Sequence, residues 1–307
     1  MRTVSLFPSA TELVTAIGAT DSLVGRSHRC NHPEDIQDLP IVTESKLNQR
    51  ASSDAKDIDA VVDDHHHGEH SYFRVVTEDL RDLQPDVLVT QSLCEVCAVP
   101  ESMTAESMEK LEGEPELVSV GPTTIGEILE TIDRLGGTLG YESGANELGT
   151  SLQNRIDDVV RELPAVSDPA HVVCLEWTDA LRCHGLWVPE IIDLLGAKVG
   201  FGSPGEHGKV IDWGDVVAYD PDVLIVSPCG RTIPEIRQDM EHLIDRPGWQ
   251  HLTAVEKDRV YLVDGELSSR HGPRVVRTLE VIAKILYPET YDHISWEADE
   301  VAHFRAV

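Results

Sequence analysis

Cysteine is the residue whose spacing first indicates chemistry in this sequence. Cys94 and Cys97 form a Cys-x-x-Cys pair in QSLCEVCAVP, directly after an apolar run. Such a pair supplies two of the four donors of a zinc site, but no second Cys-x-x-Cys completes the set. A redox pair would open a helix, whereas Pro100 indicates a helix that begins after the pair. Three interpretations stay open: two small buried thiols, a contact to a metal or metal cofactor, or a redox pair.

The other cysteines also follow apolar runs. Cys30 and Cys229 each come shortly after such a run, and Cys183 is expected in the loop after the run 171–177. Cys174 lies inside that run and is interpreted as a buried structural thiol. In a cytoplasmic chain these residues are expected to be thiols rather than disulfides. The candidate metal ligands are Cys30, Cys94, Cys97 and Cys229.

Further side chains in the same regions allow two interpretations each. Ser9 and Thr11 are predicted to cap a first helix, whose N–H groups would also suit an anionic ligand group. Trp177 and Trp187 either stack on a planar ligand or pack in the core. Arg270 is either an anion clamp or the partner of an ion pair.

A histidine cluster, His65-His66-His67 with His70, lies in a strongly polar segment. On a helix, His66 and His70 would be i, i+4 neighbours and a possible metal pair. A solvated helix end is the alternative that the polar composition favours.

The elements that must position these residues follow a repeated pattern. Three β-type runs have counterparts later in the chain: 3–7 with 171–177, 85–91 with 221–227, and 117–121 with 259–265. Continuous Val, Ile and Leu runs separated by helices are typical of buried parallel strands. The sequence therefore predicts an α/β protein of two Rossmann-like lobes with parallel sheets, and one large α/β domain is the alternative. The expected divisions are an N-terminal lobe 1–122, a helical connector 123–167 with one long helix, a C-terminal lobe 168–290 and an acidic tail 291–307.

The position of a ligand follows from this fold. Ligands of open parallel sheets bind beyond the carboxyl ends of the strands. We therefore expect the loops after the strands of both lobes to form the walls of one cleft.

The charge of the chain is strongly negative: 55 Asp and Glu stand against 25 Lys and Arg, a formal net charge of −30. Phosphate binding needs clustered Lys and Arg, so the composition argues against nucleic acid as a partner. Because the acids are scattered along the whole chain, we interpret the protein as halophilic, with salt screening its self-repulsion.

The sequence also bears on location. No stretch approaches the ~20 apolar residues of a membrane span, so we expect a protein that is not membrane-embedded. Residues 1–14 lack the long apolar segment of a signal peptide, which favours the cytoplasm. A misassigned start codon would instead allow an extracytoplasmic, membrane-associated protein.

Four segments resemble one known family: 4–33 (VSLFPSATELVTAIGATDSLVGRSHRCNHP), 85–99, 174–196 and 212–230. They are similar to the cobalamin-binding (BtuF-like) class of ABC-importer substrate-binding proteins, in the iron and cobalamin periplasmic-binding-protein superfamily. The resemblance implies two lobes joined by a long helix, with the ligand held between them. It also implies a corrinoid ligand, or in relatives haem or an iron chelate, and an ABC permease as partner.

The resemblance assigns expected roles to the candidate residues. Trp177 and Trp187 would cover the ring, and Ser9, Thr11, Arg231 and Arg270 would hold polar substituents. His28 and the candidate thiols would line the metal-facing region, and Gln91 occupies a position where cobalamin binders place an aromatic residue. No serine elbow, Walker A or His-Glu-x-x-His motif is present, so binding is expected rather than catalysis. A thiol-dependent metal-binding or redox enzyme on the same scaffold is the alternative.

Overall fold

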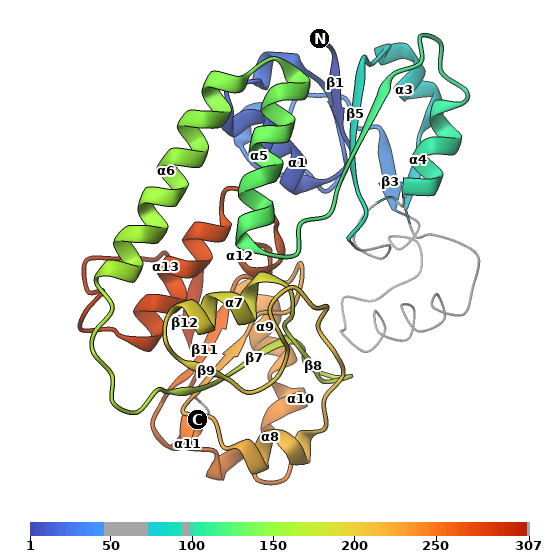
Figure 1. The fold of residues 1–307 in the computed structure, drawn as a ribbon. Coiled ribbons are helices and arrows are strands. Elements are labelled where there is room, and N and C mark those ends of the chain that lie inside the picture. Colours follow the sequence, from blue (N-terminus) through green and yellow to red (C-terminus); the bar gives the residue numbers. More distant parts are fainter. Residues whose placement is uncertain (46–72, 94–98, 100, 306–307) are drawn as a thin grey trace. The chain divides into compact units, whose positions relative to one another are not determined.

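The structure, a computed structural model, describes residues 1–45, 73–93, 99 and 101–305. The chain divides into two compact units, whose elements are labelled in Figure 1. Unit 1 comprises Met1–Pro122, Gly126–Leu152 and His271–Pro273. Unit 2 comprises Thr123–Ile125, Gln153–Arg270 and Arg274–Val307.

Unit 1 is built on a four-stranded parallel sheet in the order β2-β1-β5-β6. Its strands are β1 (Thr3–Ser5), β2 (Leu23–Arg26), β5 (Val87–Gln91) and β6 (Glu116–Val120). Every residue of β1 and β5 is buried, as expected for central strands covered on both faces. The pairing runs from Thr3 opposite Val87 to Ser5 opposite Val89, and β5 continues beyond this pair to Gln91.

A second, antiparallel pair of strands completes the β-structure described in unit 1. It consists of β3 (Thr43–Ser45) and β4 (Phe73–Val75). Phe73 and Val75 pack in one hydrophobic cluster with Val4 and Leu88 of the main sheet. This shared core holds β4 against the larger sheet, and β3 is held there through its pairing with β4.

Small residues allow close helix packing in unit 1. Its helices are α1 (Pro8–Ala16), α3 (Thr77–Leu83), α4 (Glu101–Met108) and most of α5 (Ile125–Leu139), followed by the first half of α6 (Glu142–Arg161). A Cβ atom on Gly144 would lie only 1.9 Å from the Ile17 carbonyl oxygen, at the end of α1. Glycine is therefore required where α6 meets this end of α1.

Unit 2 repeats the strand order of unit 1. Its parallel strands follow the order β9-β7-β10-β11, which corresponds to β2-β1-β5-β6, and antiparallel β8 and β12 extend the sheet. The strands are β7 (His171–Trp177), β8 (Arg182–Cys183), β9 (Lys198–Val199), β10 (Val223–Val226), β11 (Val260–Val263) and β12 (Val301–His303). The internal repeat and the two-lobed α/β class predicted from the sequence are thus confirmed.

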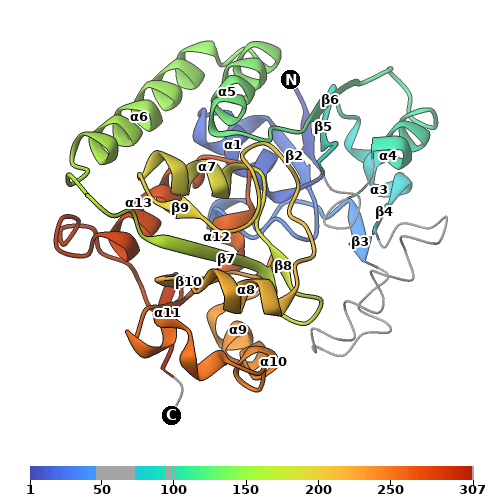
Figure 2. The same cartoon turned by 60° about the horizontal axis from the view of Figure 1, so that its bottom comes forward.

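Helices cover both faces of this second sheet (Figure 2). They are α7 (Trp187–Leu194), α8 (Trp213–Tyr219), α9 (Ile233–Asp239), α10 (Glu241–Ile244), α11 (Thr253–Glu256), α12 (Gly265–Ser269) and α13 (Val275–Leu286). Val173 and Leu175 of β7 point into a core formed with α8 to α11. The helices α7 and α12 contact α13 on the opposite side.

Two sequence expectations about local structure are wrong. Cys183 lies in β8 rather than in a loop, because residues 182 and 183 pair with β7 across a short hairpin. Ser9 and Thr11 lie inside α1 and do not cap it, since the helix begins at Pro8 after Phe7 and has no side-chain cap. Proline suits the first helical position because it lacks the N–H that would remain unpaired there.

The turn that opens α7 contains an unusual backbone conformation. Leu186 has φ 58° and ψ −123°. The Val188 N–H donates to the Gly185 carbonyl (3.2 Å), so Leu186 occupies the second position of a type II′ turn, where glycine is favoured. Hydrogen bonds between Leu186 and the backbone of Glu206 (2.6 Å) and Gly205 (3.0 Å) hold it there. A conformation of this kind costs roughly 1–3 kcal/mol.

Paired substitutions separate this strain from the loss of the side chain. Leu186→Ala and Leu186→Gly both remove the leucine side chain, but only glycine adopts the turn freely. We expect the glycine variant to have the larger free energy of unfolding, by about 1 kcal/mol or more, in chemical denaturation. At exposed Asp193 in α7 the order should reverse, because glycine ordinarily costs about 0.5–1 kcal/mol relative to alanine. An alanine variant at 186 that equals or exceeds the glycine variant would contradict the strain.

Candidate functional site

The loop after β2 is held by a buried arginine. The Arg26 guanidinium donates to the backbone carbonyls of Cys30 (2.9 Å) and Gln37 (2.8 Å). The Arg26 side chain lies almost wholly inside the protein, so these carbonyls solvate a charge that water does not reach. The guanidinium therefore organises residues 27–30, which carry His28 and Cys30.

Cys30 lies in a buried polar cluster at the carboxyl end of β1. The Thr11 hydroxyl contacts both Ser5 Oγ (2.8 Å) and Cys30 Sγ (3.0 Å). Cys30 is a thiol and is buried, as are Ser9 and Thr11. The structure thus brings Ser5, Thr11 and Cys30 together at the edge where the sequence placed a binding site.

His28 lies in the same loop as Cys30 and is half-buried. Its Nδ1 lies 2.7 Å from Thr43 Oγ1, and its ring packs 5.3 Å from the ring of Phe73. Burial lowers the pKa of His28, and the neighbouring charge of Arg29 lowers it further. The imidazole is therefore favoured in its neutral form.

Gln91 ends β5 at this same edge. It is buried, and its Oε1 accepts a hydrogen bond from the Leu93 N–H (2.6 Å). The predictions for Cys94, Cys97 and the cluster from His65 to His70 lie outside the described residues.

In unit 2, hydroxyl and imidazole groups meet at the carboxyl end of β10. Ser227 Oγ lies 2.6 Å from Ser268 Oγ, and the Ser227 carbonyl lies 2.9 Å from His184 Nε2. Burial lowers the pKa of His184. Sequence reasoning missed Ser227, Ser268 and His184, although each follows or adjoins a predicted strand.

The two tryptophans of unit 2 differ in environment. Trp187 is fully buried, and its indole N–H donates to the Ser268 carbonyl (3.0 Å). Trp177 ends β7 and is half-buried; its indole nitrogen is buried and has no hydrogen-bond partner among the residues that the structure describes. A buried position is what core packing predicts for Trp187, and its stacking on a planar ligand stays a prediction.

Arg231 follows β10 and has a carboxylate partner within unit 2. Its Nε and Nη2 donate to Asp239 Oδ2 (2.9 Å) and Oδ1 (2.7 Å), and both side chains are about 95% buried, with exposed fractions of 6% and 5%. Arg270 forms an ion pair with Glu266 (2.6 Å), the second of its two predicted interpretations. Cys229, in the loop between β10 and Arg231, is a partly exposed thiol.

Asp264 is a titratable group that the sequence reasoning did not select. It follows β11 directly and precedes α12, and its Oδ1 accepts the Glu266 N–H (2.9 Å). Burial raises the pKa of Asp264, and the hydrogen bond from the Glu266 N–H lowers it. Burial has the larger effect, so the pKa is raised to about 6. The signal available in the sequence was its position near the end of the predicted run 259–265, directly after the apolar residues that form β11.

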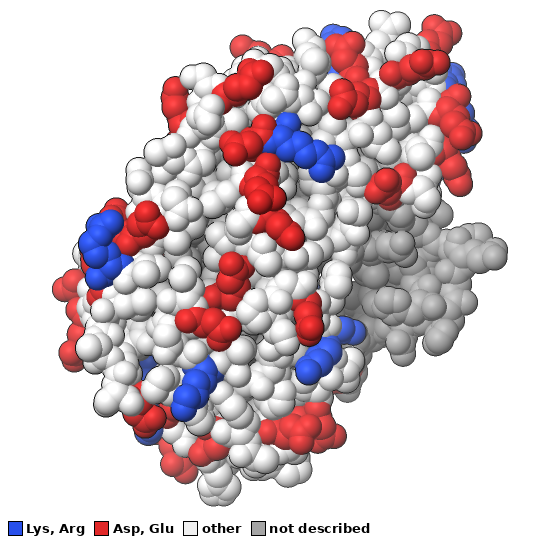
Figure 3. Space-filling view, in the orientation of Figure 1, with Lys and Arg blue, Asp and Glu red and all other residues white. Residues whose placement is uncertain are grey.

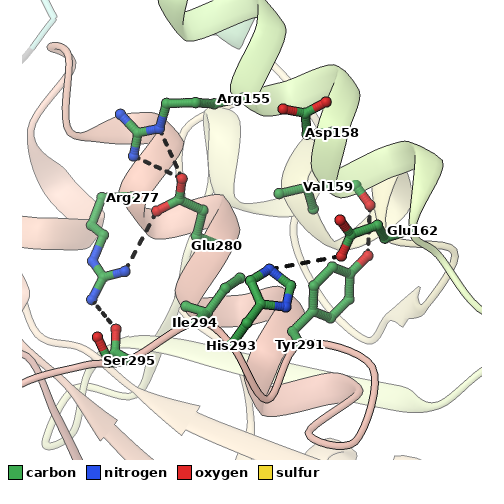
Figure 4. A pocket seen from close by; sticks show the side chains of 10 residues that line it. All are labelled: Arg155, Asp158, Val159, Glu162, Arg277, Glu280, Tyr291, His293, Ile294 and Ser295. Carbon is green, nitrogen blue, oxygen red and sulfur yellow. Dashed lines mark hydrogen bonds and ion pairs between the residues drawn. The ribbon is translucent and has the colours of Figure 1, made fainter.

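A separate pocket of about 530 Å³ lies in unit 2, and none of the residues that line it is a predicted site residue (Figure 4). Residues of α6, α13 and the segment 291–295 line it. Its charged side chains pair with one another: Arg155 with Glu280 (2.8 Å), Arg277 with Glu280 (3.4 Å), and His293 with Glu162 (3.7 Å). The pairs hold the end of the chain against the two helices, so we interpret this pocket as structural.

The described residues bear on metals, membranes and charge in three ways. No group of three or more His, Cys, Asp or Glu side chains within them could hold a metal ion. No helix in these parts of the chain is long and apolar enough to cross a bilayer. Acidic side chains lie scattered over the face seen in Figure 3, among fewer Lys and Arg.

Comparison with known protein families identifies the class of protein to which the chain belongs. Residues 3–267 match the model of the periplasmic binding protein family. The chain belongs to this family. The resemblance noted in the sequence is therefore confirmed at the level of the superfamily, which consists of substrate-binding proteins.

Individual relatives agree with this assignment. The ABC transporter substrate-binding lipoprotein YvrC of Bacillus subtilis is 22% identical over 295 residues, which cover 94% of this chain and 80% of YvrC. The heme-binding protein RhuT of Roseiflexus sp. RS-1 has a TM-score of 0.69 at 20% identity, covering 94% of this chain and 98% of RhuT. The vitamin B12 binding protein BtuF of Vibrio cholerae has a TM-score of 0.66 at 18% identity, with 93% and 96% covered. At these identities the two solved structures establish the shared fold.

The Arg231–Asp239 pair makes a prediction about stability. Asp239→Ala leaves a buried guanidinium without its main carboxylate, so we expect the free energy of unfolding to fall by about 3 kcal/mol. Asp158→Ala removes the exposed partner of Arg161 and should cost less than about 1 kcal/mol. Chemical denaturation of both variants measures the difference, and equal losses would contradict the role given to the buried pair.

Buried His271 predicts a pH dependence of stability. Its ring packs 5.1 Å from Phe7, and burial lowers its pKa from 6.5 to about 4, against the opposing charge of Glu12. Between these pH values the unfolded chain binds a proton that the folded protein does not, so stability falls as pH decreases from 6.5 toward 4. The loss attributable to this group is at most roughly 3 kcal/mol.

The substitution His271→Asn tests this assignment. The variant should lose less unfolding free energy than the wild type between pH 7 and pH 4.5, measured by denaturant titration. His251→Asn, at an exposed histidine, serves as the control and should follow the wild type. Parallel pH profiles for wild type and His271→Asn would show that another group is responsible.

Proposed function

We propose that this protein binds a corrinoid, haem or a related iron chelate as the substrate-binding component of an ABC-type importer. Membership of the periplasmic binding protein family over residues 3–267 is the observation that carries this proposal. Similar structures include proteins named for heme and for vitamin B12, which have in common a metal-centred macrocycle. Among these ligands we place a corrinoid first, on the sequence resemblance.

The residues proposed to contact the ligand lie after the strands of the two sheets. In unit 1, an imidazole and a thiol lie in one loop, and thiols and imidazoles are ligands that suit transition metals. The thiols that we propose as metal contacts are those of Cys30, Cys94, Cys97 and Cys229. The further proposed ligand contacts are Ser9, Thr11, His28, Gln91, Trp177, Trp187, Arg231 and Arg270.

A permease is the proposed protein partner, because YvrC is named as a substrate-binding component of an ABC transporter. Such a partner requires the protein to act outside the cytoplasmic membrane, and a cytoplasmic relative of the family is the alternative. Cell fractionation with and without the permease gene distinguishes the two locations.

Visible absorption spectra of the purified protein test the ligand class. Aquocobalamin, haemin and a ferric chelate are titrated separately, and we expect bands that shift and saturate at one ligand per chain. Ovalbumin, treated identically, controls for nonspecific uptake. A flat response to all three ligands would contradict the proposed function.

A further inference from the structure

One ring nitrogen of His28 is buried and unsatisfied. His28 Nε2 is shielded from solvent and has no hydrogen-bond partner in the described structure. An orphaned buried polar atom of this kind costs about 1–3 kcal/mol, and such atoms in native proteins call for an explanation. A bound ligand that contacts Nε2 would supply one.

The other ring nitrogen of His28 contacts a hydroxyl group of β3. Thr43 Oγ1 accepts the backbone N–H of His28 (3.0 Å) and lies 2.7 Å from His28 Nδ1. The Thr43 hydroxyl donates its own proton to Ser27 Oγ (3.0 Å). With that proton directed at Ser27, Thr43 Oγ1 acts as an acceptor toward the ring.

This arrangement favours one tautomer of His28. With the Thr43 proton directed at Ser27, Nδ1 carries the proton that it donates to Thr43, and Nε2 of the neutral ring keeps its lone pair. Metal-ligating histidines have the same organisation: one nitrogen donates to an oxygen, which orients the ring for the other nitrogen to coordinate.

The surroundings keep this geometry rigid. Thr43 is almost completely buried, and its strand pairs with β4, so Ser45 lies opposite Phe73. The ring of Phe73 packs against His28, and Arg26 holds the backbone of the loop through Cys30. These contacts hold His28, whose Nε2 has no partner among the described residues, in a fixed loop at the carboxyl edge of the sheet.

We propose that His28 Nε2 coordinates the metal at the centre of the bound ligand, and that Thr43 and Ser27 are positioning residues that hold the ring in the required tautomer. The proposal rests on the proposed function and narrows the substrate class. The ligand must present a metal with an open or exchangeable axial position.

Matched ligands test the coordination. Haemin is compared with metal-free protoporphyrin IX, and aquocobalamin, whose axial water exchanges, with cyanocobalamin. We expect the wild type to bind the open-metal member of at least one pair 10-fold or more tightly, with an absorption shift typical of nitrogen coordination. His28→Gln should abolish both the preference and the shift, and imidazole added to His28→Gly should restore the shift.

Variants at Thr43 test the positioning role. Thr43→Val removes the acceptor and should weaken binding of the open-metal ligand about 10-fold, as losses of such outer partners do. Thr43→Ser keeps the hydroxyl and should bind like the wild type. Circular dichroism of each variant establishes that it is folded.

The outcomes separate the inference from the proposed function. If His28→Gln binds the ligand with wild-type affinity and spectrum, the coordination by His28 is wrong while the binding function stands. If the wild type binds no tetrapyrrole or chelate, the proposed function itself fails. Nitrogen-15 NMR of histidine-labelled, ligand-free protein gives a third result independent of any ligand: a proton on Nε2 rather than Nδ1 of His28 would overturn the inference.

Discussion

Parallel strand pairing is the constraint on which the rest of the structure depends. A parallel neighbour can be reached only by a crossover connection, so each strand must end at the edge where its neighbours end. The order β2-β1-β5-β6 and its repeat β9-β7-β10-β11 therefore gather the following loops at one edge of each sheet. His28, Cys30 and Gln91 therefore follow or end strands at the same edge of the sheet in unit 1, and in unit 2 Ser227 Oγ donates to the Asp264 carbonyl (3.3 Å).

The parallel strands were predictable because burial on both faces demands continuous apolar runs. The run 171–177 coincides with β7, and 85–91 contains β5. The edge strands β8 and β12 were not predictable, since two or three residues paired on one side leave no such run. The start of α1 was also misjudged: the hydroxyls of Ser9 and Thr11 suggested a cap, but Pro8 determined where the helix begins.

Side-chain partners were harder to predict than strands, because they depend on contacts between distant residues. Arg231 pairs with Asp239, eight residues away at the far end of α9. Because the sequence contains many carboxylates, nothing in it indicates that Arg231 pairs with this one. The nitrogen of His28 that carries the proton depends on Thr43, which lies fifteen residues further along the chain, in strand β3. The sequence predicted His28 as a site residue from its position after a strand, and this stays a prediction, but nothing local to His28 indicated which nitrogen was available.

In a protein with this strong negative charge, exposed and buried electrostatic interactions respond differently to salt. If the protein works in concentrated salt, as its composition predicts, exposed charges more than a few ångströms apart interact little. Buried pairs such as Arg231 and Asp239 are screened much less, so they continue to act under the same conditions. The network around His28 uses Thr43 and Ser27, whose hydroxyl groups carry no charge. A metal-coordinating ring oriented by neutral, buried hydroxyls would keep its geometry at any ionic strength, whereas orientation by an exposed carboxylate would weaken as salt rises.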